Sequence, residues 1–486
     1  MNARDQYTAT IGIECHVQLK TNTKLFSAVG NDAREAPPNT LVSHIDFGLP
    51  GALPVLNAEA VHLAARAAFA LGSVPQKFSK FDRKHYFYPD LPMGYQITQY
   101  DEPIILGGSI TVDIDGQQKT IGITRAHLEA DAGKSTHPAG RDYSLVDLNR
   151  AGTPLLEIVS EPDMHTAAEA RAYAHELYLR MKYADVSDAD LYYGNMRFDV
   201  NVSVSKTGEL GTRTETKNIN SFRAVEKVVE YEINRQIEVL EDGGEVVQET
   251  RGWDDAKLRT FSQRTKEDAH DYRYFPDPDL PPIVLTDEYI ESVKGEMPVM
   301  PDEWRERLSR LGLDAAQTEA LLDAEVEFEQ VSFLPLLEST MDRPELAKFL
   351  ANWNVNVFIP LIREGKLKLG QQDHLRVEVE TYELLQANKL SSTNAKALFG
   401  ELIQLEVLPN DIGVYAEAKG YIQQSDEGEI LQIVDQVIAD NPKAADDVRG
   451  GEMKAIGFLV GQVMKASRGK ANPALAQQLI KKQLGL

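Results

Sequence analysis

The chain has 486 residues, of which 42% are hydrophobic, so it can fill several hydrophobic cores. Its formal charge of −24 argues against a surface that binds nucleic acid everywhere through electrostatics, so any basic contact must be local. The longest apolar stretches fall short of the roughly 18 residues that indicate a membrane-spanning helix, and no apolar signal core begins the chain. These features predict a soluble, cytoplasmic protein.

The first predicted element is a strand over residues 9–19 whose two faces differ in chemistry, because successive strand side chains point to opposite sides. One face is apolar and includes Cys15, the single cysteine, which rules out an internal disulfide. The other face carries Glu14 and His16, about 7 Å apart along the strand. This spacing allows both side chains to converge on one metal ion.

A helix is predicted over residues 58–71, between Asn57 as its N-cap and Gly72 just beyond its end. In the following segment, residues 81–96, aromatic side chains alternate with cations. Such a mixture either stacks on bases or orders a ligand pocket, or it consists of buried tyrosines with satisfied hydroxyl groups. The residues alone leave both interpretations open.

Three further strands with segregated polar faces are predicted over residues 121–129, 196–204 and 211–219, and a second helix over 222–241. Together they predict an antiparallel sheet with one polar face in an α+β domain. A solvated outer face is the usual explanation of such alternation, but the concentration of histidine, acids and cations on four strands favours a shared active surface. The charged positions that share a parity are Arg125, His127 and Glu129, then Arg197 and Asp199, then Arg213, Glu215 and Lys217.

Carboxylates beside an imidazole suit a divalent cation, and neighbouring arginine and lysine suit the phosphate oxygens that the cation bridges. This combination predicts nucleotide chemistry. The sequence has no P-loop, because Leu128 occupies the position of the leading glycine before Gly133-Lys134-Ser135. ATP would therefore bind on the sheet face. Basic residues in the later segment 264–275 either close over phosphates or pair with the neighbouring acids.

The chain becomes helical after Pro301, and a proline-rich stretch at 275–282 and a weaker break at 408–410 indicate two joints. We expect three domains: an α+β cradle domain over residues 1–297, an all-α helical domain over 298–409 and a small all-α tail domain over 410–486.

The end of the chain reverses the global charge, since seven Lys or Arg residues from Arg449 onwards oppose the single acid Glu452. On an acidic chain this favours a local contact with nucleic acid, although a basic solvated helix face is the alternative. The candidate nucleic-acid-binding residues are Lys454, Lys465, Arg468, Lys470, Lys481 and Lys482.

Several long motifs resemble the B-subunit family of the aspartyl/glutamyl-tRNA(Asn/Gln) amidotransferases. They lie at residues 11–20, 81–96, 127–135, 154–163, 217–222, 271–276, 457–462 and 469–473, so the resemblance covers nearly the whole chain. It implies a cradle domain with a kinase-like site, a helical domain, and a tail domain that grips tRNA, so the nucleic acid bound by the basic residues from Lys454 to Lys482 would be a tRNA. It also implies a heterotrimer with an amidase, the A-type subunit, which releases ammonia from glutamine, and with a small C-type subunit.

The resemblance implies an ATP-dependent carbon–nitrogen ligase with glutamine as amide donor. The cradle would use Mg-ATP to phosphorylate the side-chain carboxylate of Glu-tRNA(Gln) and/or Asp-tRNA(Asn), and ammonia would then displace phosphate to give Gln-tRNA(Gln) or Asn-tRNA(Asn) for translation. The residues agree with this chemistry, because phosphoryl transfer needs a metal and cations around developing charge and no protein nucleophile.

Site residues follow from both arguments. The family match implies Glu14, His16, Glu129, Glu157 and Glu215 as metal ligands. Charge and placement make Arg213 and Lys217, with Glu129, candidates for catalysis, and Arg197, Asp199, Arg264, Lys266 and Arg273 candidates for binding ATP.

The chain departs from the family pattern at Ala130, where many relatives have a second acid, and at Tyr192 and Tyr193, where many have polar or acidic residues. The paired cysteines that hold zinc in some members have no counterpart near Phe26 and 43–46, so no zinc is expected. These departures leave a second hypothesis, a non-catalytic tRNA-binding scaffold protein.

Overall fold

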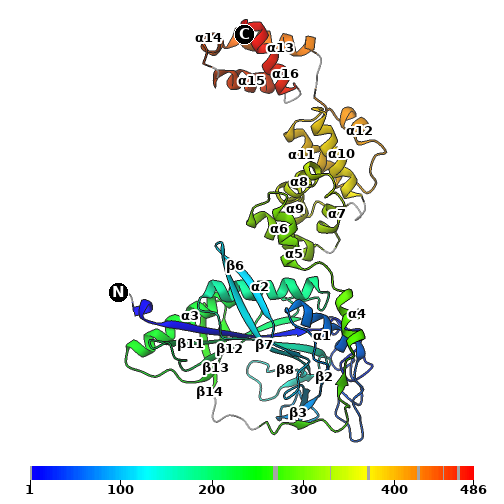
Figure 1. The fold of residues 1–486 in the computed structure, drawn as a ribbon, viewed down its shortest axis with the longest axis vertical. Coiled ribbons are helices and arrows are strands. Elements are labelled where there is room, and N and C mark those ends of the chain that lie inside the picture. Colours follow the sequence, from blue (N-terminus) through cyan, green and yellow to red (C-terminus); the bar gives the residue numbers. More distant parts are fainter. Residues whose placement is uncertain are drawn as a thin grey trace. The chain divides into compact units, whose positions relative to one another are not determined.

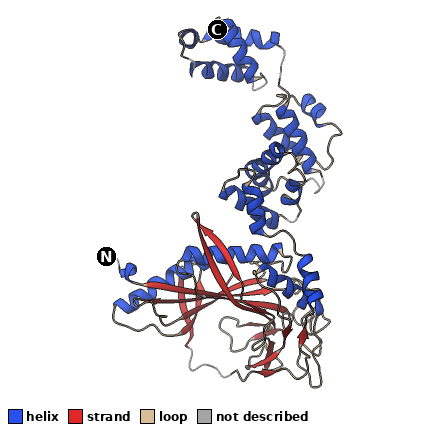
Figure 2. Cartoon of the chain, viewed as in Figure 1, coloured by secondary structure: helices blue, strands red, loops and turns tan. Residues whose placement is uncertain are grey.

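The computed structural model describes residues 3–265, 272–328, 330–368, 373–423, 427–452, 454–467 and 471–486. The chain divides into two compact units, Met1–Pro301 and Asp302–Leu486 (Figure 1). In the described residues the strands belong to the first unit, and the second unit is built of helices (Figure 2). The predicted fold class, an α+β region followed by all-α regions, is confirmed.

One large sheet forms the centre of the first unit. Its order is β14 (Arg259–Thr265), β13 (Glu249–Asp254), β12 (Thr214–Ile219), β11 (Met196–Ser205), β1 (Thr8–Gln18), β10 (Pro154–Ser160), β7 (Gln117–Ala130) and β5 (Ile105–Leu106), with β6 (Ser109–Ile114) also paired to β7. The sheet is antiparallel, as predicted, except that β12 and β13 run parallel. This pair is parallel because helix α3 (Phe222–Glu241) connects the two strands as a crossover.

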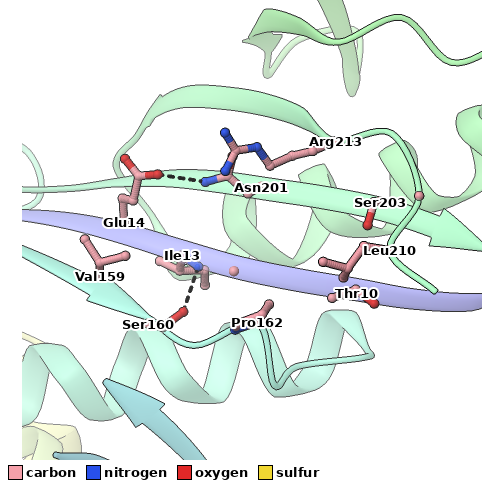
Figure 3. Close-up of a pocket in the computed structure, with 12 residues that line it drawn as sticks. Thr10, Ile13, Glu14, Val159, Ser160, Pro162, Asn201, Ser203, Leu210 and Arg213 are labelled. Carbon is pink, nitrogen blue, oxygen red and sulfur yellow. Dashed lines mark hydrogen bonds between the residues drawn. The ribbon is translucent and has the colours of Figure 1, made fainter. Parts of the chain in front are cut away.

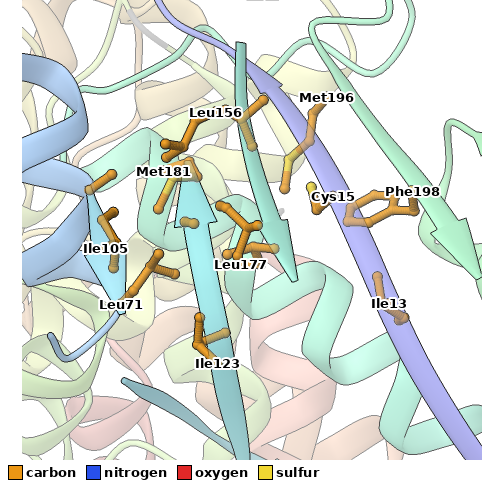
Figure 4. Packing of buried hydrophobic residues seen from close by; sticks show 14 of the residues in the cluster. Ile13, Cys15, Leu71, Ile105, Ile123, Leu156, Leu177, Met181, Met196 and Phe198 are labelled. Atoms are coloured by element: carbon orange, nitrogen blue, oxygen red, sulfur yellow. The ribbon is translucent and has the colours of Figure 1, made fainter. Parts of the chain in front are cut away.

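Strand β1 has the two faces that its sequence predicts. Ile11, Ile13 and Cys15 are fully buried, whereas Glu14 and His16 are half-buried on the opposite face. Cys15 packs beside Phe198 of β11 in the hydrophobic core (Figure 4), which also includes Leu177 and other side chains of α2 (Ala167–Tyr183). The apolar parity of β1 therefore holds the sheet to its covering helices, and the polar parity stays available.

Cap residues fix the ends of the helices in the first unit. The Asn57 side chain accepts a hydrogen bond from the Glu59 N–H at the start of α1 (Ala58–Ala70), and Ser221 accepts from Ala224 at the start of α3. The prediction for α3 is confirmed at both ends. The remaining elements of this unit are η1 (Ala3–Gln6), β2 (Phe78–Ser79), β3 (Asp82–His85), β4 (Tyr95–Thr98), β8 (Lys134–Thr136), β9 (Leu145–Asp147), β15 (Phe275–Pro276), β16 (Ile283–Val284) and α4 (Asp287–Gly295).

The second unit consists of short helices. They are α5 (Pro301–Ser309), α6 (Ala315–Glu327), α7 (Leu334–Glu338), α8 (Pro344–Trp353), η2 (Asn354–Phe358), α9 (Ile359–Arg363), α10 (His374–Gln386), α11 (Ser392–Leu402), α12 (Ile412–Ala418), α13 (Glu427–Asp440), α14 (Pro442–Arg449), α15 (Lys454–Ala466) and α16 (Pro473–Leu484). Among the residues described, no helix combines the length and the apolar character needed to cross a membrane.

Contacts within the second unit bear on the predicted boundary at 409/410. Glu401 of α11 accepts hydrogen bonds from Tyr415 of α12, from Lys419 just after α12 and from Tyr421, so these residues pack with α11. Helices α13 to α16 bury a hydrophobic cluster of their own, from Ile430 to Leu484. The three-domain division stays a proposal, and these contacts favour a second boundary after Gln423.

A buried glutamate in α10 makes the stability of the second unit depend on pH. Burial raises the pKa of Glu378 from 4.5 to about 8, although a hydrogen bond with Asn354 acts in the opposite direction. The unfolded chain loses this proton above about pH 4.5, whereas the folded chain keeps it until about pH 8. The free energy of unfolding therefore falls as pH rises through this window, by at most ~1.4 kcal/mol per pH unit.

We expect Glu378→Gln to remove this dependence, because glutamine is neutral in both states. In thermal unfolding experiments, the Tm of the variant relative to the unsubstituted chain should rise between pH 5 and pH 8. Glu383→Gln, an exposed position on the same helix, is the control. A Tm difference for Glu378→Gln that is equal at both pH values would contradict the prediction.

Candidate functional site

Strand register gathers the polar side chains on one face of the sheet. Glu14 of β1 is paired with Asp199 of β11, and His16 of β1 with Glu157 of β10. Further out, Asn201 of β11 is paired with Glu215 of β12, and Glu157 with His127 of β7. Residues directly opposite each other in antiparallel strands share a face. The shared polar face predicted from the sequence is therefore present.

Among the residues with described positions, two clusters of ligand atoms lie on this face. The first, the His16 group, consists of His16, Glu129 and Glu157, whose ligand atoms all lie within 4.8 Å of one another. His16 Nε2 is 3.4 Å from Glu157 Oε2 and 3.8 Å from Glu129 Oε1. His127 Nε2 approaches the same two carboxylates at 3.7 and 3.8 Å. Two imidazoles thus face two carboxylates in a largely buried setting.

Electrostatics keep the carboxylates of the His16 group ionised. Burial raises the pKa of Glu157, but the charge of His127 and the hydrogen bond of His16 outweigh it and hold the pKa well below its usual range. The pKa of Glu129 is also lowered against burial, mainly by His127. Burial lowers the pKa of His16, yet Glu157 and Glu129 raise it to about 9. Ionised carboxylates are the form that binds a cation.

The second cluster, the Glu14 group, consists of Glu14, Asp199 and Glu215, again with all ligand atoms within 4.8 Å. Lys217 Nζ lies 2.8 Å from Asp199 Oδ2 and 3.1 Å from Glu215 Oε1. Asn201 Nδ2 donates to Glu14 Oε1 at 3.1 Å, while Asn201 Oδ1 is buried and has no hydrogen-bond partner among the residues that the structure describes. Burial and the charges of Glu157 and Glu215 raise the pKa of Glu14.

These features fit a magnesium ion. Magnesium takes oxygen ligands; the Glu14 group offers three crowded carboxylates, and Asn201 beside it offers an amide oxygen that no described residue contacts by a hydrogen bond. Burial is the main cause of the raised pKa of Glu14, and a cation between the carboxylates would relieve the repulsion that adds to it. The nitrogen and oxygen donors of the His16 group fit a second divalent cation, which would displace the proton that His16 carries.

A cavity of about 230 Å³ adjoins the Glu14 group (Figure 3). Glu14, Asn201 and Arg213 line it together with apolar side chains such as Leu210 and Pro162. The guanidinium of Arg213 lies beside Asn201 and Glu14, and the side chain comes from the loop before β12. An apolar wall suits a flat ring, and an arginine suits phosphate oxygens, so the cavity has the chemistry of a nucleotide site.

The predicted ATP-binding residues do not lie together at one place in the structure. Asp199 lies in the Glu14 group, and Arg197 Nη2 contacts Asp131 Oδ2 at 3.3 Å. Arg273 belongs to the segment beside β3, where its carbonyl accepts a hydrogen bond from His85 Nδ1 at 3.1 Å. Lys266 and the side chain of Arg264 lie outside the described residues.

Sequence reasoning did not assign site roles to Lys84, His127 or Asn201. Lys84 Nζ of β3 lies over the rings of Tyr272 and Tyr86 at 5.0 and 5.9 Å. Burial lowers the pKa of Lys84, but the charge of Glu129 and other neighbouring groups, including Glu157, raise it overall, so the ammonium interacts electrostatically with the His16 group. Lys84 lies in the aromatic and cationic segment 81–96, and its position favours the ligand-pocket interpretation of that segment. His127 could have been found from its shared parity with Glu129.

Comparison with known proteins decides the family. Residues 9–291 match the family model described as the GatB/GatE catalytic domain, which is more than half of the chain, and residues 336–484 match the GatB domain. The B subunit of aspartyl/glutamyl-tRNA(Asn/Gln) amidotransferase from Caldanaerobacter subterraneus subsp. tengcongensis is 45% identical over 486 residues, 99% of each chain. The chain belongs to the amidotransferase B-subunit family.

Other members of the B-subunit family are equally similar over their full length. The protein of that name from Carboxydothermus hydrogenoformans is 44% identical over 99% of each chain. The one from Persephonella marina is 44% identical over 99% of this chain and 100% of the relative. The resemblance read from the sequence motifs is therefore confirmed for both the catalytic and the carboxy-terminal regions.

The match to the GatB domain includes the basic end of this B-subunit family member. Lys454 and Lys465 are exposed on α15, and Lys482 is exposed on α16 beside the half-buried Lys481. Arg468 and Lys470 lie outside the described residues. The assignment of these six residues to tRNA binding stays a prediction.

Proposed function

We propose that this chain is the component of a tRNA-dependent amidotransferase that activates an amino acid carried by tRNA. It would use ATP to phosphorylate the side-chain carboxylate of Glu-tRNA(Gln) and/or Asp-tRNA(Asn), the tRNAs that the names of its relatives specify. The observation that carries the proposal is the pair of acidic groups beside Lys217 and a cavity, all on one sheet face.

The reaction follows from the poor electrophilicity of a carboxylate. A substrate carboxylate oxygen attacks the γ-phosphorus of ATP, the bond from that phosphorus to its bridging oxygen breaks, and ADP leaves. Ammonia then attacks the acyl carbon, and the nitrogen loses a proton. The bond from this carbon to the phosphate oxygen breaks, and phosphate leaves with the electron pair. No protein nucleophile takes part, which agrees with Cys15 being buried in the core, away from the polar face.

In this proposal each group has a role set by its position. Glu14, Asp199 and Glu215 hold Mg²⁺, which supplies charge neutralisation at the phosphates when it is bound. The ammonium of Lys217 and the guanidinium of Arg213 stabilise charge on the transferred phosphoryl group. Glu129 orients the reacting end together with His16 and Glu157, which are candidates for holding a second cation.

The partners follow from the same chemistry. Ammonia must come from a glutamine amidase, so we propose an assembly with the amidase, as the A-type subunit, and with a small C-type subunit. The lysines of α15 and α16 would hold the body of the tRNA by contacts with its phosphates. We place the reaction in the cytoplasm, where its product would enter protein synthesis.

An amidation assay with the assembled amidotransferase, in which ammonium replaces glutamine as the nitrogen source, tests the proposal. With Mg-ATP and Glu-tRNA(Gln) or Asp-tRNA(Asn), supplied separately, we expect ADP and the amidated aminoacyl-tRNA in equal amounts. Uncharged tRNA is the control and should give neither product, because it offers no carboxylate. Binding of charged tRNA without ADP or amide under every condition would instead support the scaffold alternative.

A further inference from the structure

Tyr192 and Tyr193 form an exposed aromatic pair in the loop between α2 and β11. Their side chains are 87% and 53% exposed, and their rings lie 5.2 Å apart at 82°. The guanidinium of Arg34 lies 5.8 Å from the centre of the Tyr193 ring. Packing within the first unit gives no reason for two large rings at these positions. We call Tyr192, Tyr193 and Arg34 the tyrosine platform.

Hydrogen bonds order the backbone of the two tyrosines and the side chain of Arg34. Asp190 Oδ1 accepts hydrogen bonds from the N–H groups of Tyr192 and Tyr193 at 2.8 and 3.1 Å. Arg34 is fixed by Asp32, with its Nε and Nη2 each 2.8 Å from a carboxylate oxygen. The backbone that carries the rings is therefore ordered before any ligand arrives, which lowers the conformational entropy lost on binding.

The tyrosine platform borders the polar face at its His16 end. Gln18, which follows His16 on the same face of β1, donates its N–H to Asn195 O at 2.7 Å and accepts from Asn195 Nδ2 at 2.9 Å. In the same loop, Gly194 lies next to the side chain of Arg197, because a Cβ placed on Gly194 would be 4.0 Å from Cδ of Arg197. The guanidinium of Arg197 in turn contacts Asp131. The loop that carries the rings is thus anchored to the strand of the His16 group.

The position next to the polar face indicates the occupant. If the proposed function holds, the amino acid on the polar face is attached to the unpaired 3′ end of a tRNA. Unpaired bases are bound by stacking on aromatic rings and arginine planes. The neighbouring carboxylates already have partners within the protein. Asp32 and Asp188 lie beside the guanidinium of Arg34, and Asp190 accepts hydrogen bonds from backbone N–H groups. We propose that the tyrosine platform binds an unpaired nucleobase of the tRNA 3′ end.

A thermodynamic cycle of tRNA-binding affinities, in which the full-length chain and the tRNA are each changed separately and together, tests this inference. Its probes are a tRNA and the same tRNA without its unpaired 3′ nucleotides. We expect Tyr192→Ala/Tyr193→Ala to bind intact tRNA about tenfold more weakly, the scale of one stacked base. Removal of the 3′ nucleotides should then cost the variant no further affinity, although it weakens binding to the unsubstituted chain.

Two matched variants control for structure and for hydrophobicity. Tyr192→Phe/Tyr193→Phe keeps both rings and should retain the affinity for intact tRNA. Phe261→Ala removes an exposed ring from β14, away from the loop, and should leave both affinities unchanged. Fluorescence of 2-aminopurine at the 3′ terminus should be quenched by the unsubstituted chain and by the double phenylalanine variant, and not by the double alanine variant.

Three results would overturn the inference. The first is equal affinity of the double alanine variant and the unsubstituted chain for intact tRNA. The second is that the free-energy losses from the double alanine substitution and from removal of the 3′ nucleotides are additive, and the third is weakened assembly with the partner proteins while tRNA binding is unchanged. The last result would identify a protein contact. The binding cycle needs no ATP, so failure of the amidation assay alone would remove the proposed function and leave the tyrosine platform standing.

Discussion

Replacing Glu215 by glutamine is expected to lower the rate of ATP-dependent amidation by about 10²- to 10³-fold. Glu215 is buried in the Glu14 group, 3.1 Å from Lys217 and 3.2 Å from the Thr250 hydroxyl. Glutamine has nearly the same size and can still accept the hydrogen bond from Thr250, so the fold should persist. The substitution removes the negative charge that would bind Mg²⁺, and the phosphoryl group then loses its charge neutralisation.

Initial rates of ADP and amide formation, measured over a range of Mg²⁺ concentrations, check this expectation. Both products should fall together, and the variant should need more Mg²⁺ for half-maximal rate. Glu245→Gln, at an exposed position after α3, provides the same chemical change as a control. Full activity in Glu215→Gln and in Glu14→Gln would remove the Glu14 group from the metal site.

Replacing Lys454, Lys465, Lys481 and Lys482 together by glutamine should weaken tRNA binding by roughly 10²-fold near physiological salt. Each lost phosphate contact lowers the magnitude of the logarithmic salt slope by about 0.7 to 0.9, so the slope should fall by about 3 if all four lysines touch phosphate. ATP binding belongs to the sheet face and should not change. Point substitution is preferable to deletion, since deletion would remove Leu459 and Leu479 from a buried cluster.

Titration of labelled tRNA at several salt concentrations provides both the affinity and the slope. The control replaces four exposed lysines elsewhere in the second unit, Lys348, Lys366, Lys389 and Lys396, with the same loss of charge. That variant should keep most of the affinity and the full slope. An unchanged slope in the α15 and α16 variant would show that these helices do not contact the tRNA backbone.

Local rules predicted six elements of the first unit, β1, β7, β11, β12, α1 and α3, but they missed α2 and the remaining strands. Alternation with a period of two placed Cys15 in the core and Glu14 and His16 on the open face, because neighbouring strand side chains point in opposite directions. Asn57 set the start of α1 through a hydrogen bond within its own helix turn. The sequence motifs were also long enough to indicate the family. They identify the residues that a family shares, but they do not show how those side chains are arranged in space.

Only the tertiary structure decided which side chains form each group. The sequence assigned Asp199 to ATP binding and Glu14 to the metal, but strand register pairs the two and joins them to Glu215. A register shift between β11 and β12, with Asn218 at a φ of 58°, accompanies the contact of Lys217 with Asp199. Lys84, on a separate small sheet, interacts electrostatically with Glu129 and Glu157 of the His16 group. Register and packing depend on contacts between residues far apart in the chain, which local periodicity does not encode.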